Sequence, residues 1–189
     1  MAVPTHEQDE QEQAQRMKDG DRAAMKTVYC QHVRYLTAIC ARYIPSEEDV
    51  KDVMQDAFLK IFSSAGSFEY RGKGSLRGWM ARIVLNETLK FIHPGGRPVF
   101  VPLPEDMTDI ADELPDLNGV PLPTIHQMIR ELPQGYRTIF NLYVFEEKSH
   151  KEIASMLGIK ESTSASQLHR AKAILAKKVN AYKKQMNRI

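Results

Sequence analysis

Seven of the ten prolines lie between residues 94 and 123, and this cluster most limits what the chain can fold into. Proline fixes φ and has no backbone N–H, so neither a helix nor a central strand can run through such a stretch. The stretch is also acidic, with no lysine or arginine between Arg97 and Arg130. We therefore predict an extended linker over residues 94–123, which separates a first domain, residues 1–93, from a second, residues 124–189.

The first domain reads as helical throughout. Apolar residues recur at helical spacing in residues 22–43, 47–64 and 75–92, and the predicted core positions include Tyr29, Phe58 and Phe91. Stop and start signals divide these segments: a first helix ends at Gly20, Asp21 caps the second, Pro45 ends it, and Ser46 caps the third. Cys30 and Cys40 both fall in the apolar pattern, so we expect buried thiols rather than a disulfide or metal site.

The second domain ends in a helix, a tight turn and another helix. Ser149 with Glu152 forms a capping box at the start, and Gly158, four residues after the small Ala154, provides the turn. This pattern is typical of a helix-turn-helix, and two amphipathic helices precede it. No segment reads as a strand. The predicted fold class is therefore all-α, with two small helical domains joined by a proline-rich linker and a helix-turn-helix in the C-terminal one.

The second helix of this motif is polar over most of its surface. Glutamine can pair with adenine and arginine with guanine, while a helix N-terminus favours phosphate. The last thirty residues carry eight lysines and arginines against one acidic residue, which favours DNA binding over a merely solvated helix. The predicted DNA-contacting residues are Ser162, Thr163, Ser166, Gln167, His169, Arg170 and Lys172.

Two segments together resemble a known family. Residues 131–175 resemble region 4, and residues 46–92 resemble region 2, of the extracytoplasmic-function (ECF) sigma factors of the sigma-70 family. The resemblance implies an RNA polymerase sigma factor that directs core polymerase to specific promoters. In such a factor the helix-turn-helix binds the −35 element, and the first domain recognises the −10 element and opens the DNA there.

The resemblance also implies site residues in the first domain. The face that docks on the β′ subunit of core polymerase corresponds to Asp49, Asp52, Gln55, Asp56 and Phe58. Aromatic side chains in the following loop would stack on a base, and cations would contact phosphates. The residues implied for the −10 element are Phe68, Tyr70, Arg71, Lys73, Arg77, Arg82 and Asn86, whereas Trp79 is expected to be structural.

The resemblance further implies binding partners, and the sequence departs from the family at three positions. The partners are core RNA polymerase (β′ and β subunits), promoter DNA and an anti-sigma factor. Ser164, Ala165 and Gln167 stand where the family usually has an apolar residue, a lysine and an arginine, which implies a different −35 sequence.

Two other classes of function stay open on the sequence alone. A helix-turn-helix regulator that works without polymerase explains the second domain equally well but leaves the first domain's loop and acidic helix without a purpose. A helical adaptor would show no salt-dependent DNA affinity. An enzyme is not expected, because no phosphate loop or nucleophile–base pattern occurs and the six histidines are scattered. We expect no catalytic residue, metal or cofactor, no membrane insertion, and a cytoplasmic location.

Overall fold

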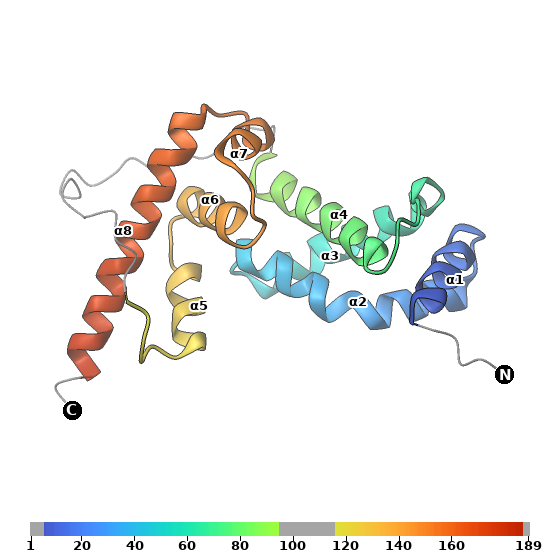
Figure 1. Ribbon diagram of the computed structural model, residues 1–189, viewed down its shortest axis with the longest axis horizontal. Coiled ribbons are helices and arrows are strands. Elements are labelled where there is room, and N and C mark those ends of the chain that lie inside the picture. The colour runs from blue at the N-terminus through green and yellow to red at the C-terminus, as the bar shows by residue number, and fades with distance from the viewer. Residues whose placement is uncertain (1–5, 95–115, 187–189) are drawn as a thin grey trace. The chain divides into compact units, whose positions relative to one another are not determined.

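The computed structural model describes residues 6–94 and 116–186, which are helices, turns and short connections without a strand among them (Figure 1). The chain divides into two compact units, Met1–Ile92 and His93–Ile189. The all-α prediction is confirmed. Residues 95–115, most of the predicted linker, lie outside the described residues. Within the described part, no helix is both long and apolar enough to cross a membrane.

The first unit contains α1 (His6–Lys18), α2 (Arg22–Tyr43), α3 (Glu47–Ser63), a short 3₁₀ turn η1 (Ala65–Ser67) and α4 (Ser75–Ile92). Helices α2, α3 and α4 pack against one another, and α1 packs against α2 and η1. The predicted stop and start signals of these helices are confirmed. Gly20 has φ +81°, Asp21 accepts hydrogen bonds from the Ala23 and Ala24 N–H groups, and Ser46 accepts one from the Asp49 N–H.

The core of the first unit follows the predicted face of α3 but departs from it on α2 and α4. Tyr29 and Phe91 are exposed: α2 buries Val28 rather than Tyr29, and α4 buries Leu85 and Leu89 instead of Phe91. The two cysteines also differ: Cys40 is buried, but Cys30 is exposed, which corrects the expectation for Cys30. Burial raises the pKa of the Cys40 thiol.

The second unit contains α5 (Leu122–Arg130), α6 (Gln134–Val144), α7 (His150–Leu157) and α8 (Glu161–Met186). The long helix α8 contacts each of the other three. No pattern in the sequence indicated a buried cation here, yet Arg137 lies in the core and donates to the backbone carbonyls of Arg130 and Leu132. The Arg130 carbonyl ends α5 and the Leu132 carbonyl lies in the connection after it, so Arg137 fixes the turn from α5 into α6.

Candidate nucleic-acid interface

The turn between α7 and α8 has the predicted geometry. The Ser149 hydroxyl accepts a hydrogen bond from the Glu152 N–H at 3.3 Å, and the Glu152 carboxylate accepts one from the Ser149 N–H at 2.8 Å. Gly158 has φ +66°, and the Ile159 N–H donates to the Ala154 carbonyl at 3.0 Å. The helix-turn-helix is therefore built by local hydrogen bonds that the sequence already indicates.

The capping box makes the stability of this unit depend on pH. Hydrogen bonds from the Ser149 N–H and then its hydroxyl hold the pKa of Glu152 below its ordinary value of 4.5. A carboxyl with a lowered folded pKa stabilises the fold above its unfolded pKa, and this contribution is lost as the pH falls through the folded value. We expect Glu152→Gln to lower the melting temperature at neutral pH and to match wild type once acid protonates Glu152. Circular dichroism melts at a series of pH values test this, and a gap that does not change with pH would contradict it.

A histidine joins the two helices of the motif. His150 Nδ1 lies 2.9 Å from the hydroxyl oxygen of the fully buried Ser164, and the Tyr143 ring stacks on the imidazole with centroids 4.9 Å apart. Sequence reasoning treated His150 as one of six scattered histidines. The available signal was Ser164 itself, since a hydroxyl on the inward side of a helix needs a polar partner.

Fewer of the predicted DNA-contacting side chains on α8 are exposed than the sequence suggested. Ser162, Ser166 and His169 are exposed, and Thr163 and Arg170 are partly exposed. Gln167 is only 6% exposed, which corrects its assignment to the outer surface. It follows Ser164 by three residues and precedes Ala171 by four, and both of these are buried, so all three share the inward side. Lys172 is partly exposed and lines an apolar pocket beside α5.

The loop between η1 and α4 forms a second candidate surface. A pocket of about 500 Å³ lies beside it, with Arg71 and Arg82 among its lining residues. Arg77 projects toward α2, where its guanidinium lies 4.8 Å from the centre of the Tyr35 ring. Lys73 and Asn86 are exposed, and Tyr70 is partly exposed. The pocket therefore has two cations in its lining, Arg71 from the loop and Arg82 from α4.

Phe68, which was predicted to stack on a base of the −10 element, is buried in the structure. It is only 3% exposed, and its ring lies 5.3 Å from the Trp79 ring. The packing of Phe68 against Trp79 forms an apolar wall of the pocket rather than a free stacking platform. Tyr70 is then the aromatic side chain of the loop that has accessible surface.

The acidic face of α3 lies beside an apolar groove. Asp52, Gln55 and Asp56 are exposed and Asp49 is partly exposed, as predicted. Phe58 is not an exposed anchor, because it is 5% exposed and packs under the Tyr29 ring with centroids 4.6 Å apart.

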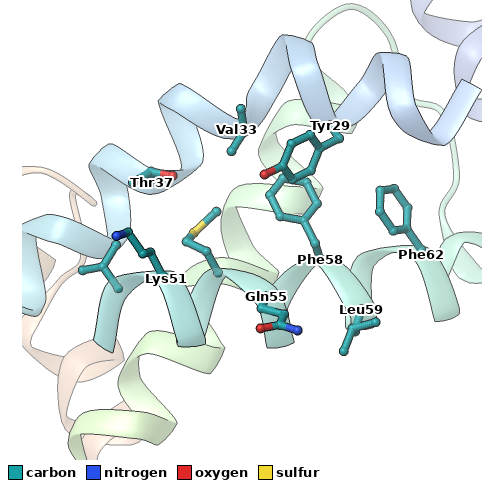
Figure 2. Close-up of a pocket in the computed structure, with 10 residues that line it drawn as sticks. Tyr29, Val33, Thr37, Lys51, Gln55, Phe58, Leu59 and Phe62 are labelled. Carbon is teal, nitrogen blue, oxygen red and sulfur yellow. The ribbon is translucent and has the colours of Figure 1, made fainter. Parts of the chain in front are cut away.

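Figure 2 shows the groove, of about 460 Å³, that α2 and α3 form around these rings. Leu59 lines it and is 63% exposed, a feature that sequence reasoning missed. The signal was a leucine next to Phe58 on the polar side of the helix.

Comparison with known proteins matches both units. The model described as Sigma-70 region 2 matches residues 28–94, and the model described as Sigma-70, region 4 matches residues 123–175. The chain is 26% identical over 185 residues to an RNA polymerase sigma-H factor of Pseudomonas aeruginosa, which covers 92% of this chain and 94% of the relative. It is 30% identical over 158 residues to ECF RNA polymerase sigma factor SigM of Mycobacterium tuberculosis, which covers 84% of this chain and 78% of the relative. A solved structure titled "Structure of CnrH in complex with the cytosolic domain of CnrY" has a TM-score of 0.47 and 23% identity, covering 89% of this chain and 96% of that chain.

Proposed function

Because this chain belongs to the ECF group of the sigma-70 family and is an RNA polymerase sigma factor, we propose how its parts divide the work of initiation. Its partners are RNA polymerase and promoter DNA. Residues 1–93 bind the polymerase and the −10 element, residues 124–189 bind the −35 element, and residues 94–123 link them. A regulator that works without polymerase is set aside, since the region 2 match covers residues 28–94, most of the first unit.

In this proposal α8 enters the major groove at the −35 element. Ser162, Thr163 and Ser166 lie at its N-terminal end, where the helix dipole favours a phosphate or a base acceptor. His169 and Arg170 lie one turn further along. With Gln167 turned inward, base reading depends on fewer side chains than the sequence suggested.

The pocket beside the loop is the observation that carries the −10 assignment. It combines an apolar wall, made by Phe68 and Trp79, with the cations Arg71 and Arg82. A base flipped out of the duplex needs such a wall for its ring and cations for the phosphates on either side. We assign the capture of a −10 base to this pocket, with Tyr70 stacking at its edge and Asn86 contacting the strand.

The acidic face and the groove of α3 suit a protein partner. An apolar centre with a charged rim is the usual make-up of a protein interface. We assign this surface to the β′ subunit of core polymerase and leave the β subunit to the second domain. An exposed leucine beside a groove also favours a second partner that covers it when polymerase is absent, which fits an anti-sigma factor. The polymerase catalyses RNA synthesis, and we place the sigma factor and the polymerase in the cytoplasm.

Run-off transcription tests this proposal. Core polymerase, the purified protein and a promoter from upstream of its own gene are combined, and permanganate scores open bases near −10. We expect transcription and opening only with both proteins present. Asn86→Ala should reduce opening by about tenfold, the loss of one base contact, while Asn180→Ala, an exposed asparagine on α8, changes nothing. Salt-sensitive duplex binding without opening at any promoter would favour the regulator instead.

A further inference from the structure

Helix α1 packs on the rest of the first unit through one stripe of side chains. Ala14 and Met17 on this helix are buried, and Glu10 lies four and seven residues before them on the same face. That face contacts α2 and η1. The region 2 match begins at residue 28, so it does not include α1.

Helix α4 starts without a cap of its own. The residue before it is Gly74, with φ +84°, which has no side chain to accept a hydrogen bond from the first N–H groups of the helix. The two carboxylate oxygens of Glu10 serve as the acceptors instead. One carboxylate oxygen accepts from the Gly74 N–H at 2.7 Å, and the other accepts from the Leu76 N–H at 2.9 Å. A carboxylate from 64 residues earlier in the sequence therefore caps α4.

A second carboxylate fixes the angle at which α1 meets α2. The Arg16 guanidinium donates two hydrogen bonds to one oxygen of Asp21, at 2.9 and 2.7 Å. The other Asp21 oxygen caps α2 by accepting from the Ala23 and Ala24 N–H groups. Because one side chain holds both helix ends, the position of Glu10 relative to α2 is set.

Helix α1 thus holds both ends of the loop between η1 and α4, residues 68–74. It contacts η1, where the loop starts, and Glu10 binds Gly74, where the loop ends. Gly72 and Gly74 in this loop have positive φ, a conformation that glycine adopts readily, and the Glu10 carboxylate holds the second of them through its N–H. We propose that Glu10 is a positioning residue for promoter opening, which holds the loop and the start of α4 in the geometry that receives the −10 strand. This inference rests on the function proposed above.

The test compares two charge-neutralising variants of the same helix in the full chain. Glu10→Gln leaves one acceptor oxygen where there were two, while Glu12→Gln changes an exposed side chain two residues further along the same helix. Hydrogen exchange at the Gly74 and Leu76 amides is expected to rise by about tenfold in Glu10→Gln only. Permanganate opening of a duplex promoter should fall by about tenfold in the same variant, with unchanged affinity for core polymerase.

A promoter with a pre-opened −10 region separates positioning from general damage. Since unpairing no longer has to be driven, Glu10→Gln should there transcribe within about twofold of wild type. Equal exchange and opening in the two variants would overturn the inference and leave the sigma function intact. Loss of core binding by Glu10→Gln, or no recovery on the pre-opened promoter, would also overturn it. If wild type with core polymerase opens no promoter, the proposed function fails together with the inference.

Discussion

Phe68→Ala is expected to lower the free energy of unfolding of the first unit by about 3–5 kcal/mol, the usual cost of removing a buried phenylalanine ring. The side chain is 3% exposed and packs against Trp79, so the truncation leaves a cavity beside that ring. The chain has a single tryptophan, so fluorescence during urea unfolding reports directly on this contact. A midpoint close to that of wild type would show that Phe68 is not part of the core.

Tyr70→Ala is the matched control, because Tyr70 is an aromatic residue of the same loop with accessible surface. If it stacks on a captured base, its loss should reduce promoter opening by about tenfold, near the lower end of measured stacking energies. The urea midpoint should change far less than in Phe68→Ala. If Tyr70→Ala instead lost much stability and opened promoters normally, Tyr70 would be the core residue and not the stacking one.

Leu59→Ala is expected to weaken binding to core polymerase by about 30-fold, or about 2 kcal/mol, the scale of an interface hot spot. Leu59 is 63% exposed, so its truncation should leave the melting temperature of the free protein unchanged. It borders the groove of Figure 2 and stands among exposed acidic residues of α3. Fluorescence anisotropy of labelled protein titrated with core polymerase measures the affinity.

Two variants separate the groove from the charges around it. Phe91→Ala removes another large apolar side chain of the same unit, 44% exposed at the end of α4, and should bind as wild type does. Asp56→Asn should slow association and reduce its dependence on salt, with a smaller effect on dissociation. Normal affinity in Leu59→Ala would mean that the groove is not at the polymerase interface.

Local signals in the sequence were read correctly. Asp21, Ser46 and the pair Ser149–Glu152 cap their helices through hydrogen bonds to groups two or three residues away, so short patterns suffice to find them. The core face of α3 also follows from spacing alone, because one regular helix repeats every 3.6 residues.

Contacts between distant segments were not accessible in the same way. Phe68 is in a loop, where no periodicity indicates a buried side, and its partner Trp79 is on the next helix. Gln167 was placed outside because it is polar, although its position on α8 turns it inward. The capping of α4 by Glu10 joins residues 64 positions apart, and no local pattern encodes it.

The different environments of the two cysteines have a practical consequence. Cys40 is buried and its pKa is raised, so little thiolate forms there, whereas Cys30 is exposed on α2 next to Tyr29 of the groove. A maleimide dye should therefore attach to Cys30 in the wild-type protein without any engineered site. Because the dye would sit beside the surface assigned to polymerase, changes in its emission provide a direct optical signal of holoenzyme assembly.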